Sequence, residues 1–344
     1  MSKILKAKDV FAQIKADLIG KDSYRGVTLT YTWLANQFGH FSLGFIPSFI
    51  LYLILSNFHT NSYAIARAPW YIWGFWIAFE TYNFLGPLLL KSHSQSKLLY
   101  VKGNSYTFQP AWGNILFDTL TDLSFFGLGA MFLGFLGNGG EIYKIVCISI
   151  AILLLYPSGY WYLTKMYLQI PQYPYQLRLA QWDFPINDNG RKSVADFLNN
   201  ANSKLHLFVF GEENTGKTSL SVGLATELSI RHEASVYTTA MKLSSDFFYP
   251  AGQTGSAPTP WTWRDASVLI IDDINPGKPI TTPMVSAETF LSFIDTYATN
   301  PENRKALASR KTIWVLGSTN EKESWRKMLL TIGVAENDIV EISL

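Results

Sequence analysis

The feature that most constrains this chain is the stretch Gly211–Ser219, which reads Gly-Glu-Glu-Asn-Thr-Gly-Lys-Thr-Ser. It follows the apolar run Leu205–Phe210 and precedes the helix-prone stretch Leu220–Ile230. A strand, a turn of the pattern G-x-x-x-x-G-K-[ST] and a helix, in that order, are typical of a loop that binds phosphate groups. Glycine permits backbone angles that turn successive N–H groups toward phosphate oxygens, and the helix N-terminus adds partial positive charge. The stretch therefore predicts a phosphate-binding loop.

The side chains of this loop predict the ligand. Lys217 is expected to reach the β and γ phosphates of a nucleoside triphosphate, and the Thr218 hydroxyl is expected to ligate Mg²⁺. Guanine-specific proteins carry an N-K-x-D tetrad, which Asn320-Glu321-Lys322-Glu323 does not supply. ATP and Mg²⁺ are therefore the predicted cofactors. The other predicted nucleotide-binding residues are Gly211, Asn214, Thr215, Gly216 and Ser219.

Two carboxylates follow the apolar run Val268–Ile271, about 55 residues after Lys217. A carboxylate at the end of a buried strand beside a phosphate-binding loop can hold Mg²⁺ through water, which is the role expected of Asp272. The adjacent Asp273 is placed to orient or deprotonate the attacking water. Asn320, after the next strand, is placed to polarise the γ-phosphate or that water. Together these residues predict hydrolysis of ATP.

The second half of the chain alternates between strand-like and helix-like stretches, which is typical of a parallel sheet with covering helices. We predict an α/β domain over residues 193–344. Its expected strands are Leu205–Phe210, Ser235–Thr239, Val268–Ile271, Thr312–Leu316 and Ile339–Ser343. Its expected helices are Ser193–Asn200, Lys217–Ile230, Met241–Phe248, Ser286–Thr299 and Glu321–Leu330.

The first half is apolar and aromatic in a way that favours a membrane. Of all residues only 16% are charged and 15% are aromatic, and residues 41–168 are crowded with apolar side chains. Each apolar span there is near the roughly 20 residues that cross a bilayer, and Trp and Tyr cluster at span ends. We predict a four-span α-helical transmembrane bundle, with spans near Phe41–Ser56, Pro69–Leu90, Asn114–Leu136 and Ile142–Tyr162, the last broken by Pro157 and Gly159.

Loop charges predict the orientation of these spans. Basic residues are enriched before the first span, and between the second and third spans they are Lys91, Lys97 and Lys102. The loop between the first and second spans has only Arg67, and the turn Gly137–Glu141 has no basic residue. Because basic loops stay in the cytoplasm, we predict an integral membrane protein whose two termini, loop 91–113 and ATPase domain are cytoplasmic.

Three carboxylates fall within the predicted spans. They are Glu80 in the second span and Asp118 and Asp122 in the third, where a spacing of four residues places both on one helix face. Acids inside a membrane are costly and usually face protein or water. Two interpretations stay open: an ion or proton path, or polar contacts between neighbouring helices.

The remaining segments carry weaker patterns. Residues 1–40 begin with an amphipathic basic stretch, Met1–Gly20, that suits a membrane interface or a partner surface. Residues 169–192 hold Pro171, Pro174 and Pro185 and are predicted to be a linker. The single cysteine, Cys147, excludes an intrachain disulfide, and five scattered histidines indicate no zinc-type site. A net charge of +2 gives no general argument for binding nucleic acid.

The soluble half resembles the helicase-loader and transposition-helper branch of the AAA+ ATPases. Three stretches carry the resemblance: Gly211–Ser219, Val236-Tyr237-Thr238-Thr239-Ala240 and Leu269-Ile270-Ile271-Asp272-Asp273-Ile274. It covers roughly residues 193–344 and none of the apolar half. It implies a five-stranded parallel sheet in the order 5-1-4-3-2. It also implies Mg·ATP at subunit interfaces and a ring-shaped or helical homo-oligomer, such as a hexameric ring.

The same resemblance implies residue roles and marks departures from the family. Lys217 and Thr218 would bind phosphate and Mg²⁺, Asp272 the metal, Asp273 the water, and Asn320 would be the sensor. About 24 residues follow Asn320, so the helical lid and its second sensor arginine are expected to be missing. The family often has glutamate where Asp273 stands, which argues against fast hydrolysis.

An arginine acting on the neighbouring subunit is expected after the sensor. Arg326 occupies that region, and Arg304 and Arg310 are rivals for the role.

Three function classes remain open at this point. In the first, a membrane-embedded oligomeric ATPase remodels or translocates a protein or nucleic-acid client. In the second, nucleotide state gates a pore built by the spans, as in defence or stress signalling. In the third, the spans anchor a nucleic-acid transaction, which rests on analogy with the loader family alone. The first class is the one we favour.

Overall fold

The computed structural model describes residues 5–18, 29–90, 107–108, 111–200, 204–249, 260–274, 285–296, 300–317 and 321–344. The chain divides into two compact units. We call residues 29–90 and 111–162 the helical unit. Residues 163–344, together with residues 5–15 and 107–108, form the α/β unit. Near the N-terminus, α1 covers Ala7–Leu18.

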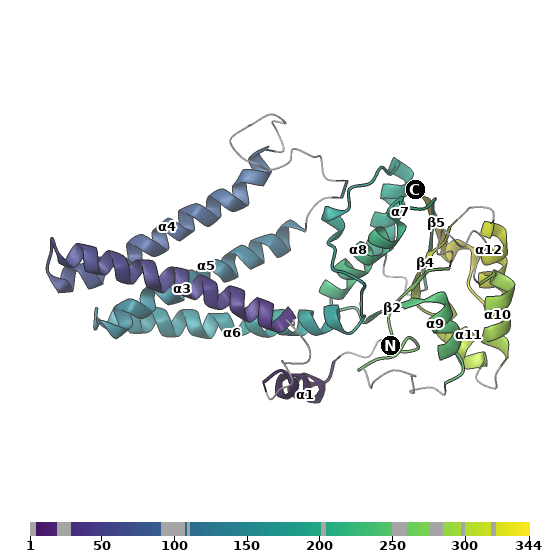
Figure 1. Ribbon diagram of the computed structural model, residues 1–344, viewed down its shortest axis with the longest axis horizontal. Coiled ribbons are helices and arrows are strands. Elements are labelled where there is room, and N and C mark those ends of the chain that lie inside the picture. Colours follow the sequence, from purple (N-terminus) through teal and green to yellow (C-terminus); the bar gives the residue numbers. More distant parts are fainter. Residues whose placement is uncertain are drawn as a thin grey trace. The chain divides into compact units, whose positions relative to one another are not determined.

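The helical unit is built from four long helices (Figure 1): α3 Leu29–Ser56, α4 Asn61–Leu90, α5 Trp112–Leu136 and the larger part of α6 Glu141–Gln169. Because α3 begins at Leu29, the end of the predicted segment 1–40 belongs to the first long helix. The sequence wrongly predicted a break at Pro157 and Gly159, since α6 continues through both. A helix can pass a proline when neighbouring groups compensate for the lost backbone hydrogen bond.

Three of these helices are long and apolar enough to cross a bilayer: Trp33–Ser56, Trp112–Leu136 and Glu141–Gln169. The predicted second span, Pro69–Leu90 in α4, is not among them. Its composition explains this, since α4 carries many Trp and Tyr residues together with Glu80 and Asn83. Length and composition therefore support three membrane spans.

Close contact between α3 and α5 depends on two glycines. A Cβ atom at Gly44 would lie 2.1 Å from the Phe126 carbonyl oxygen, and one at Gly129 would lie 2.0 Å from that of Phe41. Helix α4 joins the pair through indole hydrogen bonds, from Trp76 to the Leu43 carbonyl at 2.9 Å and from Trp73 to the Leu123 carbonyl at 3.1 Å. Small residues thus let two backbones meet, and tryptophan N–H groups bind carbonyls of the neighbouring helices.

The α/β unit contains a five-stranded parallel sheet in the order β2-β3-β4-β1-β5. Read from the other edge this is 5-1-4-3-2, so the predicted order is confirmed. The strands are β1 His206–Phe210, β2 Ser235–Thr239, β3 Val268–Asp272, β4 Lys311–Val315 and β5 Ile339–Ser343.

Both faces of the sheet are covered, because the side chains of its central strands alternate between two apolar cores. Leu207 and Val209 face one core, with α7 Asp188–Asn199 and α8 Lys217–Ile230. Phe208 and Phe210 face the other. The helices on that side (Figure 1) are α9 Ala240–Asp246, α10 Ala287–Asp295, α11 Asn300–Ala308 and α12 Lys322–Thr331. One long helix was predicted at Ser286–Thr299, whereas α10 ends at Asp295 and α11 follows.

The segment predicted as a linker packs on the α/β unit. Its 3₁₀ helix η1, Leu179–Gln181, lies against α8, and Leu179 and Trp182 are buried in the core below that helix. The Arg178 guanidinium pairs with the Glu227 carboxylate at 2.8 Å. Apolar side chains between the prolines hold this segment in place, so it forms part of the α/β unit.

Replacing Gly129 by leucine tests the contact between α3 and α5. The new side chain would meet the α3 backbone, and overpacking of this kind costs about 1–3 kcal/mol. We expect the thermal midpoint of the detergent-solubilised protein, followed by circular dichroism, to fall. Gly113→Leu is the matched control on the same helix, because a Cβ there meets nothing within 4 Å. An equal loss in both variants would show that the close approach is unimportant.

Candidate nucleotide-binding site

The predicted phosphate-binding loop lies between β1 and α8, at the carboxyl end of the sheet. The Gly211 N–H donates to the Gly317 carbonyl beyond β4 at 3.1 Å, which fixes where the loop leaves the sheet. Asn214 and Gly216 have positive φ angles of 64° and 86°. These left-handed residues turn the chain sharply into α8, whose first N–H groups have no partner within the helix and suit an anion.

Gly216 is required for a second reason besides its φ angle. A Cβ atom there would lie 2.6 Å from the Phe184 ring. The indole N–H of the adjacent Trp182 donates to the Gly216 carbonyl at 2.9 Å, and the two aromatic rings lie 5.5 Å apart. Trp182 and Phe184, which belong to the segment predicted as a linker, therefore hold the loop in place at Gly216.

Lys217, the first residue of α8, curls back over the loop and donates from Nζ to the Glu212 carbonyl. Partial burial lowers the pKa of Lys217. The charge of the Asp272 carboxylate is the largest of the effects that raise it. Both residues lie at the carboxyl edge of the sheet, Lys217 in the first turn of α8 after β1 and Asp272 at the end of β3. Thr218 is the next residue of α8, and Ser219 donates from its hydroxyl to the Gly216 carbonyl at 2.9 Å.

Asp272 ends β3 and is buried, with 3% of its surface exposed. Each of its carboxylate oxygens accepts one hydrogen bond, Oδ1 from the Asp273 N–H at 2.8 Å and Oδ2 from the Tyr237 hydroxyl at 2.7 Å. Burial and then the Asp272 charge raise the pKa of Tyr237, so the phenol stays a donor. These two bonds fix the orientation of the carboxylate.

Asp273 has a positive φ angle of 53°, which is uncommon for a residue with a side chain. Partial desolvation and then the charge of Asp272 raise the pKa of Asp273. A carboxylate of raised pKa is a better proton acceptor, which suits a residue that activates water.

The oxygen ligands at this edge suit Mg²⁺. Magnesium is typically held by one or two protein oxygens together with phosphates and water. Thr218 supplies a hydroxyl and Asp272 a fixed carboxylate. Among the described residues, no group of three or more His, Cys, Asp and Glu side chains is arranged to hold a metal ion by itself. The donor set therefore fits a metal that arrives with a nucleotide.

Sequence reasoning missed the aromatic residues around this site. Tyr237 was noted only as part of a family stretch, and Trp182 and Phe184 were assigned to a linker. Tyr175 also lies near the site, since burial and the Asp272 charge raise its pKa while a hydrogen bond with Ser219 lowers it. The available signal was the density of aromatic residues between 173 and 184, in the segment before α7.

The structure does not bring every predicted residue to the site. Asn320 lies outside the described residues. Arg326 lies on α12 and pairs with Glu336 and with Glu341, the latter at 3.0 Å.

The two rival arginines are also engaged within the chain. Arg304 pairs with Asp295 through two hydrogen bonds, at 2.7 and 2.5 Å. Arg310 is buried, and its guanidinium donates to the carbonyls of Trp263 and Ala266 at 2.8 and 2.7 Å. Its contacts are those of a structural residue.

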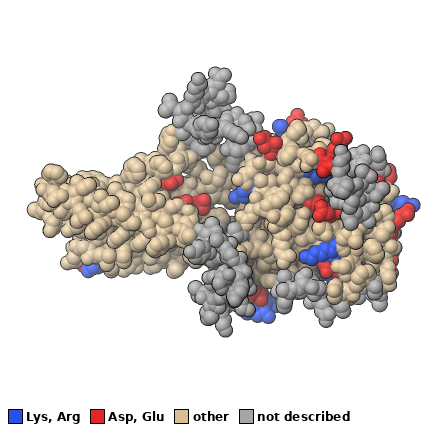
Figure 2. Space-filling model, in the orientation of Figure 1, with Lys and Arg blue, Asp and Glu red and all other residues tan. Residues whose placement is uncertain are grey.

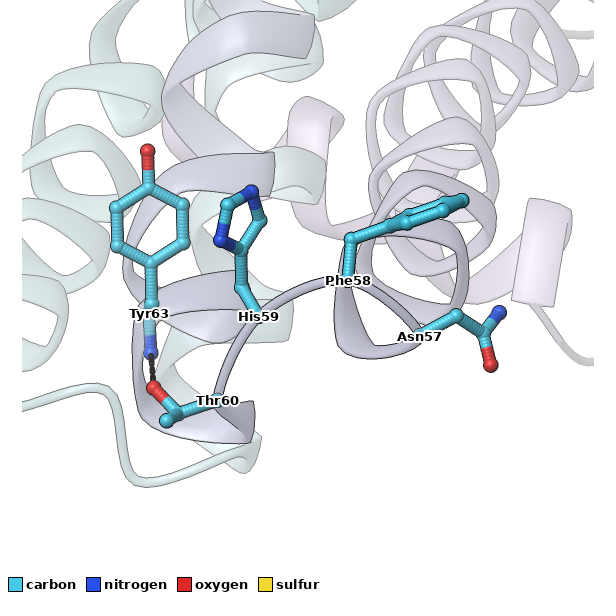
Figure 3. Close-up of a pocket in the computed structure, with 5 residues that line it drawn as sticks. All are labelled: Asn57, Phe58, His59, Thr60 and Tyr63. Atoms are coloured by element: carbon cyan, nitrogen blue, oxygen red, sulfur yellow. Dashed lines mark hydrogen bonds between the residues drawn. The ribbon is translucent and has the colours of Figure 1, made fainter.

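A shallow hollow in the helical unit is a different kind of feature. It lies at the turn between α3 and α4 and is lined by Asn57, Phe58, His59, Thr60 and Tyr63 (Figure 3). The rings of His59 and Tyr63 lie side by side, 4.6 Å apart, while Asn57 points away from them. None of these residues belongs to the phosphate-binding loop or to the end of β3.

Comparisons with known proteins do not identify a family for this chain. No protein-family model and no curated protein matches the chain. Among solved structures, the crystal structure of DnaI is similar at 17% identity with a TM-score of 0.27, over 46% of this chain and 85% of that one.

Replacing Trp182 by phenylalanine tests the support that it gives the loop. The change keeps an aromatic ring but removes the hydrogen bond to Gly216, which is worth about 1 kcal/mol. We expect the Kd for a fluorescent ATP analogue, measured by equilibrium titration, to rise about fivefold. Trp325→Phe is the matched control, because that indole donates to Glu321 on another part of the unit. Unchanged affinity in the Trp182 variant would contradict this role.

Proposed function

We propose that this protein is a membrane-embedded ATPase that binds and hydrolyses Mg·ATP at the loop after β1. The observation that carries the proposal is the arrangement at one edge of a parallel sheet, where a loop of the phosphate-binding pattern leads from β1 into Lys217 of α8 and β3 ends at the fixed Asp272 carboxylate. A positive side chain and a fixed carboxylate at the same edge of the sheet suit the phosphates and the metal of one nucleotide.

The proposal assigns a role to each residue of the site. The backbone N–H groups from Gly211 to Ser219 and the Lys217 ammonium hold the phosphates. Thr218 and Asp272 hold Mg²⁺, which supplies charge neutralisation at the β and γ phosphates. Asp273 accepts a proton from the attacking water or orients it. Asn320 contacts the γ-phosphate or that water.

The membrane part of the proposal is a four-span bundle with α4 as the second span. Three spans rest on length and composition. We include α4 because its indole groups donate to α3 and α5, so it packs as a full member of the same bundle. Figure 2 shows few charged side chains over the described helices of this unit, in contrast to the α/β unit. With four spans and the basic loops inside, both termini and the ATPase domain are cytoplasmic.

The proposed working form is a homo-oligomer, such as a hexameric ring, in which ATP-driven motion acts on a protein or nucleic-acid client. Arg326 is the proposed finger toward the nucleotide of a neighbouring subunit. For this it would have to exchange Glu336 and Glu341 for the phosphates, which makes the arginine available only in the assembled form.

Substitutions at the loop and at β3 test the chemistry. Lys217→Ala and Asp272→Ala each remove charge stabilisation of phosphoryl transfer, and we expect ATP hydrolysis to fall at least about 100-fold. Asp273→Asn should retain ATP binding and lose turnover. The measurement is phosphate release by purified protein with Mg²⁺ and with chelator. Lys192→Ala and Asp196→Ala on α7 are matched controls, and wild-type protein without ATP binding would refute the proposal.

The pH dependence gives an independent test of Asp273. Its carboxylate must be ionised to accept a proton, and its pKa is raised above the ordinary aspartate range. Hydrolysis, measured as kcat/KM, should therefore decline on acidification at a higher pH than an ordinary aspartate would give. In Asp273→Asn the residual rate should lack this acid limb. If the kcat/KM of the variant declined at the same pH as that of the wild type, the titration would belong to another group.

Topology is tested with single reactive sites in intact cells. Probes that do not cross the membrane should reach the turn 137–140 from outside, and the two termini only after the cells are opened. Cys147→Ser protein serves as the background for introducing single cysteines. A terminus that reacts in intact cells would contradict the four-span arrangement.

A further inference from the structure

The helical unit contains a cluster of polar side chains drawn from three helices. The His40 Nδ1 atom of α3 lies 3.0 Å from Asp122 Oδ1 of α5. Gln37, three residues earlier on α3, donates from Nε2 to the same oxygen at 3.2 Å. Glu80 of α4 lies one turn after Trp76, whose indole N–H donates to the Leu43 carbonyl of α3 at 2.9 Å, so Glu80 shares the face of α4 that is turned toward α3. Three helices thus contribute polar side chains to one region of the bundle.

The cluster lies at mid-depth of the helices. At a rise of 1.5 Å per residue, Asp122 is about 15 Å from the start of α5 and Glu80 about 15 Å from the end of α4. His40 is about 10 Å from Trp33, where the apolar part of α3 begins. The hydrocarbon core is about 30 Å thick, so side chains about 10–15 Å from one end of a span would lie well inside it.

Polar groups lead to the cluster from one side. Trp33, Gln37 and His40 recur at spacings of four and three residues, so they share one face of α3. Gln37 is only 3% exposed, and its Oε1 atom, like the Trp33 indole nitrogen, has no hydrogen-bond partner among the described residues. On α5, Asp118 lies one turn before Asp122 and is exposed. Both stripes start at the N-terminal ends of their helices.

On its other side the cluster is closed by packing. The His40 ring lies 4.7 Å from the Phe126 ring, which stacks on Trp76 at 4.2 Å. Beyond these rings the backbones of α3 and α5 touch at Gly44 and Gly129. The cluster is therefore bordered by polar side chains toward the N-terminal ends of α3 and α5, and by packed apolar groups on its other side.

The charges of the cluster do not cancel when both acids are ionised. Helix α3 contributes His40, α4 contributes Glu80, and α5 contributes Asp122 with Asp118 one turn away. Within these three helices the other basic side chain is Arg67, which is 13 residues from Glu80 and lies over the Tyr63 ring. A net negative charge in hydrocarbon is costly, and each proton bound at the cluster reduces it. A metal fits poorly, because the described residues contain no group of three such ligands arranged to hold one.

We propose that Asp122, Glu80 and His40 form a proton-binding site inside the membrane, loaded from the side of the bilayer at which α3 and α5 begin. The proton arrives from water, forms an O–H bond with a carboxylate of Asp122 or Glu80, and leaves by the same route. The site rests on the proposed four-span bundle and not on ATP hydrolysis. Under that topology it senses cytoplasmic pH.

Dicyclohexylcarbodiimide tests the site, because this apolar reagent adds to protonated carboxyl groups within lipid and leaves a stable N-acylurea. The full-length protein in liposomes is treated and its peptides are analysed by mass spectrometry. We expect the adduct on Asp122 or Glu80. Its yield should fall about tenfold for each pH unit above the titration midpoint when pH is raised on the cytoplasmic side. Raising the pH on the other side should leave the yield unchanged.

Three variants make the result specific. The double variant Asp122→Asn with Glu80→Gln should lose the adduct. Glu141→Gln is the matched control, since Glu141 is an exposed acid of the same unit paired with Lys144. His40→Gln removes the basic partner and should keep the adduct to higher pH.

The assay also separates this inference from the proposed ATPase. Phosphate release is measured in the same liposomes before treatment. No adduct on either acid at any pH, or equal sensitivity to pH on both sides, would overturn the proton site while leaving the ATPase standing. An adduct on protein that cannot bind ATP would support the proton site and contradict the proposed ATPase.

Discussion

The position of β1 between β4 and β5 is the constraint on which the candidate nucleotide site depends. All five residues of β1 are buried, so their backbone groups must find partners within the sheet. Parallel pairing on both sides supplies them and sets the register, with Phe208 beside Trp314 and Glu341. The Gly211 N–H continues this ladder to Gly317. The loop therefore leaves the sheet where β3 presents Asp272, because the carboxyl ends of parallel strands meet at one edge.

Aromatic side chains then turn that edge into a defined site. Trp182 and Phe184 hold the loop at Gly216, and Tyr237 holds one oxygen of Asp272. These contacts need no ligand, so the loop and the Asp272 carboxylate are ordered in advance. Pre-ordering reduces the entropy that binding must overcome. It also ties the segment after α6 to the chemistry, since Trp182 belongs to neither β1 nor α8.

In the helical unit a different constraint dominates. Within a bilayer, polar groups find hydrogen-bond partners only in the protein, and the indole N–H groups of Trp73 and Trp76 donate to carbonyls of adjacent helices. Glycines at positions 44 and 129 allow the closest approach of two backbones. The same approach brings His40 and Asp122 together. A polar cluster inside a membrane costs stability. This cost favours a functional role for the cluster, and the role that we propose is proton binding.

The sequence by itself determined the glycine-rich loop between β1 and α8, the acids at the end of β3, the approximate strand positions and three apolar spans. These depend on local patterns: glycine spacing and runs of apolar residues. It did not reveal that residues 169–192 brace the loop, that α10 and α11 are separate helices, or that α6 passes Pro157. Nor did it reveal that Gln37 and His40 join Asp122. The brace on the loop and the contacts of Gln37 and His40 with Asp122 join residues dozens of positions apart. Only the tertiary structure decides them, because no local pattern specifies which distant side chain will satisfy a buried polar group.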